Sequence, residues 1–308
     1  MGILVSEEVE ELKECPVCGS RKIAVTQSVK DFALTQEEFT VWQCADCRLE
    51  FTNPRPAAGE IGRYYDFPDY VSHTDESGGW LNQAYRVARM YTVGRKVGLI
   101  DQLVKGKTVP KTLLDYGCGS GYFVAAAAKD GWQVMGLEPN EKARSQASEL
   151  VGSKGKVVES LDELLATKSK FSIITLWHVL EHVHQLNETV GVLMQLLDKG
   201  GRLVVAVPNA EAEDAKHYGQ HWAAYDVPRH LYHFNPNAMK DLWARHGAEV
   251  LTTKPMPLDT YYVSLLSERF RKGSAVSALL QAWKANGRAS KNGKYSSLLY
   301  TLKRVGDA

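Results

Sequence analysis

The sequence predicts an α/β fold: a Rossmann-like, seven-stranded, mostly parallel sheet with helices on both faces, preceded by a small zinc ribbon. Two observations lead to this prediction. From residue 112 onward, short apolar segments alternate with helical ones, which is typical of a parallel sheet buried on both faces. Upstream of this region, four of the five cysteines fall into two Cys-x-x-Cys pairs.

Length and composition narrow the class of protein. The 308 residues are enough for more than one domain, and 44% of them are hydrophobic, as in ordinary globular proteins. The formal net charge is +1, so no overall field attracts nucleic acid. There is no apolar run of 18 residues, and residues 1–8 lack the pattern of a signal peptide. We therefore expect a cytoplasmic protein that contacts a membrane only peripherally, if at all.

The cysteine pairs predict a structural zinc site in an N-terminal module, residues 1–56. Its ligands would be Cys15, Cys18, Cys44 and Cys47. Segments 23–29 and 39–43, which lie between the pairs, have the composition of strands. Four thiolates fill a tetrahedral Zn²⁺ shell and leave no open position for catalysis. Redox-active cysteine pairs are the alternative, which two such pairs in one strand-rich segment disfavour.

A linker and a helix at 80–104 make up residues 57–110 and lead into the main domain, residues 111–308. In that domain, strands are expected at 112–115, 133–138, 156–159, 172–177, 202–207, 249–253 and 297–304. Helices are expected between them, at 122–129, 140–150, 161–166, 190–197 and 236–246. The last strand should return antiparallel beside the sixth.

Two insertions interrupt this alternation, at 209–234 and 257–294. In the second, Val276, Leu279, Leu280 and Trp283 recur at helical spacing, so we expect it to be helical. Ligands of an open parallel sheet bind beyond the carboxyl ends of its strands, where both insertions should emerge. The zinc ribbon, by contrast, is peripheral to this region in sequence.

The first strand of the main domain leads into a glycine-rich turn. Asp115 ends the strand, and Gly117, Gly119 and Gly121 follow it. Glycine has no Cβ, so such a turn can bend sharply and expose bare backbone to a ligand at the start of a helix. Glu138 ends the next strand, where a carboxylate can accept both hydroxyls of a ribose. Together these residues predict a site for a nucleoside-bearing cofactor other than NAD.

Four motifs follow one another along the main domain. They are Asp115-Tyr-Gly-Cys-Gly-Ser-Gly121, Gly136-Leu-Glu-Pro-Asn140, Leu176-Trp-His-Val-Leu-Glu-His182 and Asp198-Lys-Gly-Gly-Arg-Leu203. This ordered set resembles the class I S-adenosylmethionine-dependent methyltransferases over residues 112–253, and to the C-terminus if the last strand belongs to the sheet. The core resembles the ubiquinone-biosynthesis O-methyltransferases in particular.

The resemblance implies an enzyme of the methyltransferase class with S-adenosylmethionine as its cofactor. It assigns the cofactor to Asp115, Tyr116, Gly117, Gly119, Glu138, Pro139, Glu159, Ser160, Trp177 and His178. The family often has an aspartate at the adenine, where this chain offers Glu159 and Ser160, so that contact stays open.

Residues 178–182 read His-Val-Leu-Glu-His, which also matches the H-x-x-E-H signature of a metalloprotease. The protease interpretation needs a helix, whereas this segment directly follows an apolar strand. In the ubiquinone-biosynthesis enzymes, a Glu-x-x-Glu-His motif can hold a divalent cation, and here His178 replaces the first glutamate. Either Glu181 and His182 bind a metal, or they line the pocket floor and bond locally.

The first insertion carries four histidines and is the best candidate for acceptor chemistry. A neutral histidine can take a proton from a hydroxyl group as it is methylated. We expect His221 or His230 as the base, Asp226 as the residue that orients it, and His182 nearby. Arg229 could bind a carboxylate or phosphate as a fork, or it could simply tie the loop to a strand end.

The second insertion and the last strand are strongly basic. Residues 268–304 contain nine Lys or Arg residues against Glu268 alone. An apolar stripe beside basic residues can lie on a membrane surface or hold an acidic or lipid-linked substrate. The alternative is a lid helix with a solvated basic face.

The function that follows is S-adenosylmethionine-dependent O-methylation of a small molecule that is sugar-like, lipid-linked or quinone-type. An RNA or protein methyltransferase that reads its target with the zinc ribbon is one alternative. Residues 1–52 lean acidic and have few aromatic residues for stacking, so we do not expect a nucleic-acid partner. A non-catalytic cofactor-binding module is the other alternative, which the polar residues of the first insertion disfavour.

Overall fold

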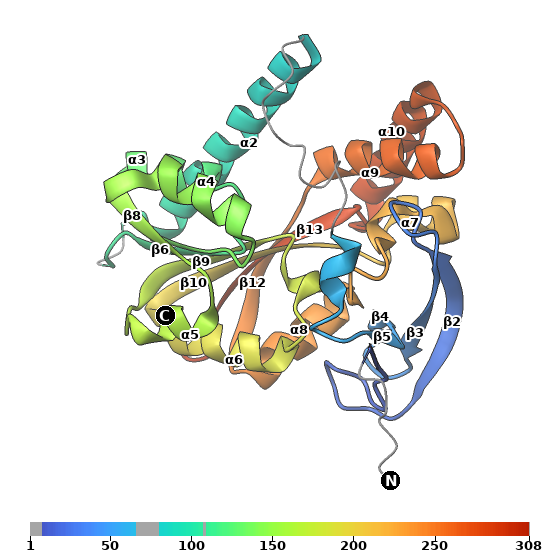
Figure 1. Cartoon of the computed structure of the whole chain (residues 1–308), viewed down its shortest axis with the longest axis horizontal. Helices are drawn as coiled ribbons and strands as arrows, with labels where there is room; N and C mark the ends of the chain where they lie inside the picture. Colours follow the sequence, from blue (N-terminus) through green and yellow to red (C-terminus); the bar gives the residue numbers. More distant parts are fainter. Residues whose placement is uncertain (1–7, 66–79, 107–108, 308) are drawn as a thin grey trace.

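The computed structural model describes residues 8–65, 80–106 and 109–307, with backbone alone for 80–89. Most of the linker between residues 57 and 80 therefore lies outside the described residues. The main domain is built on one seven-stranded sheet with the order β12-β13-β10-β9-β6-β7-β8 (Figure 1). All neighbouring strands are parallel except β13, which runs antiparallel to both β10 and β12. The predicted fold class and the antiparallel last strand are both confirmed.

Six of the seven strands begin and end within two residues of their predicted bounds, and the fifth begins five residues before its predicted start. The strands are β6 (Thr112–Tyr116), β7 (Gln133–Leu137), β8 (Gly155–Val158), β9 (Phe171–Trp177), β10 (Leu197–Pro208), β12 (Ala248–Pro255) and β13 (Ser297–Arg304). The central strands are apolar on both faces, because neighbouring residues such as Leu113 and Leu114 are both fully buried. This pattern is what a parallel sheet covered on both sides requires.

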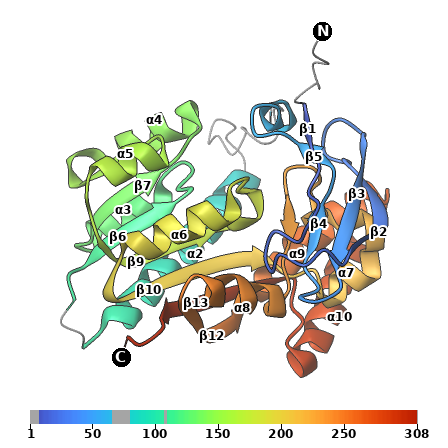
Figure 2. The ribbon, with the colours of Figure 1, turned by 90° about the horizontal axis from the view of Figure 1, so that it is seen from below.

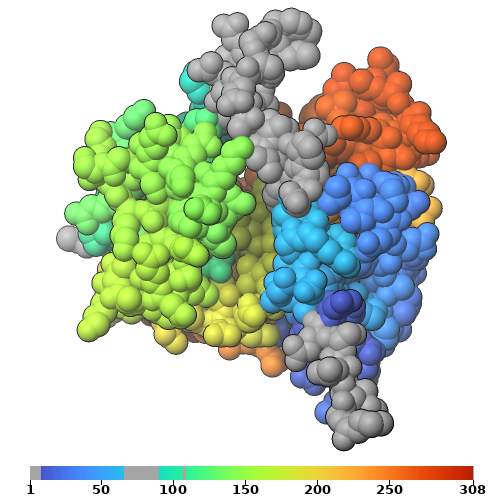
Figure 3. Space-filling model, viewed as in Figure 1, coloured from blue at the N-terminus to red at the C-terminus, as the bar shows by residue number. Residues whose placement is uncertain are grey.

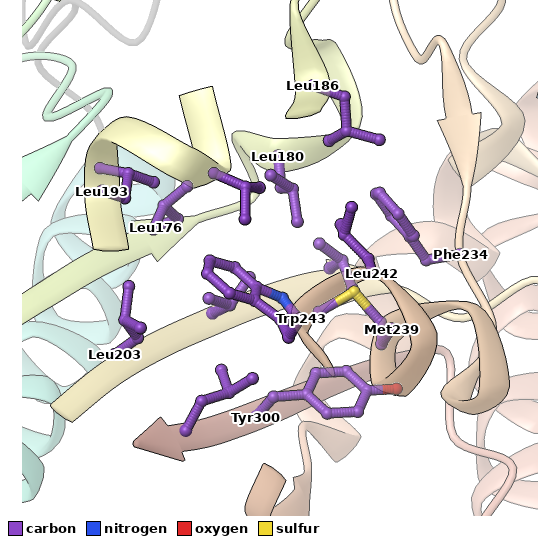
Figure 4. Close-up of a cluster of buried hydrophobic side chains, with 14 of the residues drawn as sticks. Leu176, Leu180, Leu186, Leu193, Leu203, Phe234, Met239, Leu242, Trp243 and Tyr300 are labelled. Atoms are coloured by element: carbon purple, nitrogen blue, oxygen red, sulfur yellow. The ribbon is translucent and has the colours of Figure 1, made fainter. Parts of the chain in front are cut away.

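Helices cover the two faces of the sheet. On one face pack α2 (Trp80–Val104), α3 (Tyr122–Lys129) and α4 (Glu141–Val151), which meet Leu113 and Ile173. On the other face pack α5 (Leu161–Ala166), α6 (Leu186–Leu196) and α8 (Pro236–Arg245). Figure 4 shows the core of this second face, where Trp243 of α8 lies among leucines of β9, β10 and α6.

Two helix boundaries differ from the prediction for local reasons. Asn140 precedes α4 as its N-cap, because its side-chain oxygen accepts the N–H of Ala143 at 3.0 Å. Helix α6 begins at Leu186, four residues earlier than expected. Polar residues separate Leu186 from Val190 in the sequence, but both side chains are buried on the same face of the helix.

Both insertions are ordered. The first contains α7 (Glu213–Tyr218), short 3₁₀ turns at Gly219–His221 and Ala223–Tyr225, and β11 (Tyr232–His233). The second is helical, as its periodicity predicted, and forms a hairpin of two helices, α9 (Pro257–Phe270) and α10 (Ala275–Asn292). None of the helices in the described part of the chain is both long and apolar enough to cross a bilayer.

The N-terminal module is a small β structure joined to the main domain. Strands β2 (Ile23–Lys30), β3 (Glu38–Cys44) and β4 (Glu50–Thr52) form an antiparallel sheet, and β1 (Val9–Glu10) pairs with β5 (Arg55–Pro56). The fourth strand of the larger sheet is β11, from the first insertion, which pairs with β4. Figure 2 shows the module lying beside the main domain, so it is peripheral in sequence but not in space.

The four cysteines of the module meet at one point. Their sulfurs lie within 4.8 Å of one another, with Cys15 and Cys47 at 3.5 Å and Cys18 and Cys44 at 3.5 Å. Zn–S bonds of about 2.3 Å place the sulfurs of a tetrahedral shell roughly 3.8 Å apart. The residues therefore fit a structural zinc ion, as the spacing predicted.

We expect about one zinc per chain, and Cys44→Ser should release it. Structural zinc is worth on the order of 10 kcal/mol to a small module, so this variant should melt several degrees lower. Metal analysis by mass spectrometry and thermal melting test this. The matched control is Cys118→Ser, which replaces the free cysteine outside the cluster and should keep the zinc. A Cys44→Ser protein that keeps its metal and its melting temperature would exclude the site.

Candidate active site

A large cleft opens between the carboxyl ends of the parallel strands and the N-terminal module. Figure 3 shows the recess between the α3–α5 region (green) and the module (blue). Its volume is about 2080 Å³. Typical small-molecule pockets measure about 300–1,000 Å³, so this cleft has room for two ligands side by side. Its walls come from the glycine loop, the strand ends, the first insertion, α9 and the N-terminal module.

The glycine loop forms one end of the cleft. Gly117 has φ +75°, and an added Cβ there would meet a methyl group of Val179 at 2.5 Å. Gly119 has φ +53°, but an added Cβ there would meet nothing within 4 Å, so its bare backbone faces open space. The N–H of Gly119 donates to Glu138 Oε2 at 2.9 Å, and Glu138 Oε1 accepts the N–H of Asn140 at 2.9 Å. The loop and the carboxylate at the end of β7 thus share one wall, as predicted, together with Tyr116 and Pro139.

Asp115 lies beneath the glycine loop and is not part of the cleft surface. Its side chain is 2% exposed and accepts a hydrogen bond from the Thr175 hydroxyl at 2.5 Å. Burial raises the pKa of Asp115 to about 7, although the Thr175 bond and the nearby Lys96 ammonium oppose that rise. A cationic group bound above the loop would favour the ionised carboxylate.

The end of β9 places Trp177 and His178 in the cleft wall. The Lys96 ammonium lies 4.1 Å from the centre of the Trp177 ring, a cation–π contact made by α2. His178 has φ +57°, and its ring lies between two carboxylates, with Nε2 3.1 Å from Asp259 and Nδ1 3.5 Å from Glu181. Burial lowers the pKa of His178, but the two carboxylates outweigh burial and raise it to about 10. His178 is therefore an imidazolium at neutral pH.

The segment after β9 is a 3₁₀ turn, Leu180–His182, and not a helix. The protease interpretation of H-x-x-E-H is therefore wrong, because two histidines on such a turn do not share one face as they do on a helix. Glu181 is fully buried, and its carboxylate is paired with His178, whose Nδ1 lies 3.5 Å from Oε1. Burial raises the pKa of Glu181, but the His178 imidazolium outweighs burial and lowers it.

Glu181 is joined by two histidines in a cluster that we call the Glu–His–His cluster: Glu181, His182 and His230. Each offers one potential ligand atom, and these atoms lie within 4.8 Å of one another. Nδ1 of His182 lies 3.0 Å from the Arg229 carbonyl, and Nδ1 of His230 lies 2.8 Å from the Ala224 carbonyl. A carbonyl oxygen only accepts, so Nδ1 of His230 carries hydrogen and its Nε2 keeps a lone pair when the ring is neutral, whereas Nδ1 of His182 also lies 2.9 Å from the Tyr65 hydroxyl, which can donate to it. Burial, with His230 nearby, lowers the pKa of His182 to about 4.

Asp226 and Arg229 are held in a buried ion-pair network. The Arg229 side chain is 1% exposed, and its terminal nitrogen lies 2.7 Å from Asp226 and 2.8 Å from Asp31 of the N-terminal module. A second nitrogen donates to the Tyr64 carbonyl at 3.0 Å. Arg229 therefore has the tying role that we considered, and it is not among the cleft-lining residues. Asp226 does line the cleft, with Oδ2 3.9 Å from His230 Nε2.

Besides Arg229, three of the residues considered for the site lie apart from it. His221 stacks on Phe32 with ring centres 5.0 Å apart, and it does not line the cleft, whereas His230 does. Ser160 is the N-cap of α5, and Glu159 forms an ion pair with Arg144 at 3.1 Å. Neither Glu159 nor Ser160 is among the residues of the cleft wall.

Sequence reasoning missed the contribution of the N-terminal module. Lys30, Phe32 and Gln36 line the cleft, as does Tyr65, whose hydroxyl lies 2.9 Å from His182 Nδ1. It also missed Asp259 of α9, the partner of His178. No local motif marks these residues, because their role depends on contacts between segments that are far apart in the chain.

Comparisons with known proteins agree with this geometry. A family model described as a methyltransferase domain matches residues 89–253. Curated relatives include the ubiquinone biosynthesis O-methyltransferases of Serratia proteamaculans, 30% identical over 109 residues, and Aromatoleum aromaticum, 33% identical over 104 residues. These matches cover 34% and 32% of this chain and 45% and 44% of the relatives, so the chain spans less than half the length of each.

Solved structures show the same fold at low identity. Magnesium protoporphyrin IX methyltransferase from Synechocystis, with bound S-adenosylhomocysteine, has a TM-score of 0.53 at 14% identity and covers 80% of this chain and 100% of its own. The 1,6-didemethyltoxoflavin-N1-methyltransferase of Burkholderia thailandensis has a TM-score of 0.50 at 15% identity, over 85% of this chain and 98% of its own. Since the family model spans more than half of the sequence, this chain belongs to the methyltransferase-domain family.

Proposed function

We propose that the protein is an S-adenosylmethionine-dependent methyltransferase that methylates an oxygen atom of a small-molecule acceptor, sugar-like, lipid-linked or quinone-type. The observation that carries the proposal is that one cleft contains groups suited to the cofactor at one end and groups suited to acceptor chemistry at the other. One end has bare glycine backbone and the Glu138 carboxylate, and the other has the Glu–His–His cluster with its neutral His182 ring. The curated relatives, which are named O-methyltransferases, support an oxygen acceptor.

The residues at the glycine end fit the cofactor. Gly119 would leave room for its methionine part, Glu138 would accept ribose hydroxyls, and Trp177 would flank the reactive centre. When bound, S-adenosylmethionine supplies an electrophilic methyl group on a sulfonium. Little covalent help is needed for such a transfer, so positioning of the acceptor supplies much of the rate.

At the other end, His230 is the base that the geometry favours. Its Nδ1–H is fixed on a main-chain carbonyl, so Nε2 can accept the proton of an acceptor hydroxyl as that oxygen gains the methyl group. The Asp226 carboxylate, 3.9 Å from Nε2, would stabilise the imidazolium that results. Arg229 would act indirectly, because its ion pair with Asp226 holds that carboxylate in place.

A divalent cation is a second candidate for the same position. The potential ligand atoms of two imidazole rings and of the buried Glu181 carboxylate lie within 4.8 Å of one another, and such a set can hold a metal. Glu181, His182 and His230 would hold it, and it would bind the acceptor oxygen as a Lewis acid. The His178 imidazolium, which replaces the first glutamate of the related motif, would weaken such a site.

The main proposal predicts where a labelled methyl group goes. Purified protein with methyl-labelled S-adenosylmethionine and a cell extract should label compounds that extract as small molecules or lipids. Label in RNA or protein alone would overturn the small-molecule acceptor.

The same assay tests the base. His230→Gln should lower kcat about 10²–10⁴-fold, the usual worth of a general base, with cofactor binding unchanged by calorimetry. His221→Gln is the matched control from the same insertion and should keep its activity. Equal losses in both variants would contradict the assignment.

Metal analysis decides between base and cation. If a cation acts at the cluster, the protein should carry a second metal equivalent beside the zinc, and Glu181→Gln should lose only that one. A single equivalent in the wild type, even after incubation with Mg²⁺, Mn²⁺ or Zn²⁺, would exclude the metal.

Asp115→Asn should separate cofactor binding from stability. The fold raises the pKa of Asp115, so the carboxyl loses stability relative to the unfolded chain as pH rises from about 4 to about 7. The asparagine variant escapes this loss. Without cofactor it should be as stable as wild type or more stable at pH 8, by up to about 4 kcal/mol, with the difference vanishing near pH 4.

Urea denaturation at pH 4.5 and 8, with calorimetry of S-adenosylmethionine binding, measures both effects. We expect binding to weaken at least tenfold in the variant. Unchanged affinity together with a stability difference that does not vary with pH would contradict the role given to Asp115.

A further inference from the structure

Helix α10 packs with its small residues inward and its large apolar residues outward. Its buried residues are all alanines: Ala278, Ala282, Ala285 and Ala289. Four larger side chains on the opposite side form what we call the α10 stripe: Val276, 68% exposed; Leu279, 50%; Leu280, 53%; and Trp283, 68%. A stripe of this size on a water-facing helix marks an interaction surface more often than chance exposure.

Contacts with α9 fix this orientation. The Thr260 hydroxyl donates to Asn286 Oδ1 at 2.9 Å, and Asn286 Nδ2 donates to the Pro257 carbonyl at 3.0 Å. At the other end of the hairpin, the Ser277 hydroxyl donates to Glu268 Oε1 at 3.0 Å. The alanine face is thus held against its neighbours, and the stripe cannot turn inward without breaking these bonds.

The segment that follows Glu268 and contains α10 carries charges of one sign. From residue 269 to residue 304 the chain contains nine Lys or Arg residues and no Asp or Glu. Three of them, Arg269, Arg271 and Lys272, precede α10, and Lys284, Arg288 and Lys291 lie on it. A surface of this kind attracts a negatively charged partner.

We propose that the α10 stripe docks on the surface of an anionic lipid bilayer. Tryptophan with aliphatic residues, flanked by Lys and Arg, is the composition of a helix that lies in a membrane interface. Anionic head groups complement the basic residues beside the stripe. A second copy of the chain would instead bring two basic surfaces together, so charge favours the bilayer as the occupant.

The position of the hairpin links this surface to the cleft. Leu258, Tyr262, Leu266 and Phe270 of α9 line the cleft wall. Neighbouring helices pack about 8–10 Å apart, so docking through α10 would bring that wall close to the bilayer. This part of the inference rests on the proposed function, and it favours the lipid-linked class among the acceptors.

Vesicle binding tests the inference without any turnover. The full chain is floated with phosphatidylcholine vesicles that contain phosphatidylglycerol, and with vesicles of phosphatidylcholine alone. We expect binding to the anionic vesicles only, weakened by salt. Leu279→Ser with Trp283→Ser should lower the partition coefficient at least tenfold, and Lys284→Glu with Arg288→Glu should lower it severalfold.

The matched control is Leu150→Ser with Leu165→Ser, which removes two exposed leucines of α4 and α5 and should leave binding unchanged. Circular dichroism melts check that every variant is folded. No binding of the wild type to anionic vesicles, or equal binding by the stripe variant, overturns the inference. A dimer in solution that the stripe substitutions dissociate, without vesicle binding, assigns the stripe to a second copy and also overturns it.

These results are separate from the test of the proposed function. Methyl transfer without vesicle binding would support the proposed activity and contradict the membrane-binding role of the α10 stripe. Vesicle binding without methyl transfer to any extracted compound would support the membrane surface and contradict the proposed activity.

Discussion

The buried ion pair between Arg229 and Asp31 is the interaction on which the cleft depends. It joins the first insertion of the main domain to a loop of the N-terminal module, and β11 adds to the same connection by pairing with β4. Removing one partner of a buried pair leaves an uncompensated charge, at a cost of about 3–5 kcal/mol. The module and the insertion therefore form one wall of the cleft, and the four-cysteine cluster belongs to the module that contributes to this wall.

The two ends of the cleft present different chemical groups. At the glycine end, backbone and the Glu138 carboxylate face the space where a cofactor with a positive sulfur and a ribose would lie. At the other end, the Ala224 carbonyl fixes the tautomer of His230, and the Arg229 carbonyl and the Tyr65 hydroxyl both contact Nδ1 of His182. His178 stands between the two ends with its charge compensated by Glu181 and Asp259. Burial lowers the pKa of His182 and keeps its ring neutral, whereas the two carboxylates raise the pKa of His178 and keep it charged.

Most of the fold could be predicted from the sequence, because apolar strands and capped helices leave local patterns such as Ser160 before α5. The glycine loop and Glu138 were predictable for the same reason. The roles of His221 and Arg229 were not predictable, because they lie in the same polar segment as His230. Which of these side chains faces the cleft depends on how the segment folds in three dimensions. Thr52, for example, bonds to the His230 carbonyl across 178 positions. Such a contact has no local signature, and neither does the outward direction of the α10 stripe.

The place of β13 between β10 and β12 has a consequence for synthesis on the ribosome. In the seven-stranded sheet, β12 lies at the edge and pairs with β13 alone. During translation, β12 therefore emerges with no neighbour to bond and remains an open edge while residues 256–296 and then β13 follow. The parallel strands β6 to β10 can assemble before this happens, since domains form their cores as the chain grows. The α9–α10 hairpin, which packs on α7 and the turns of the first insertion, is made in this interval.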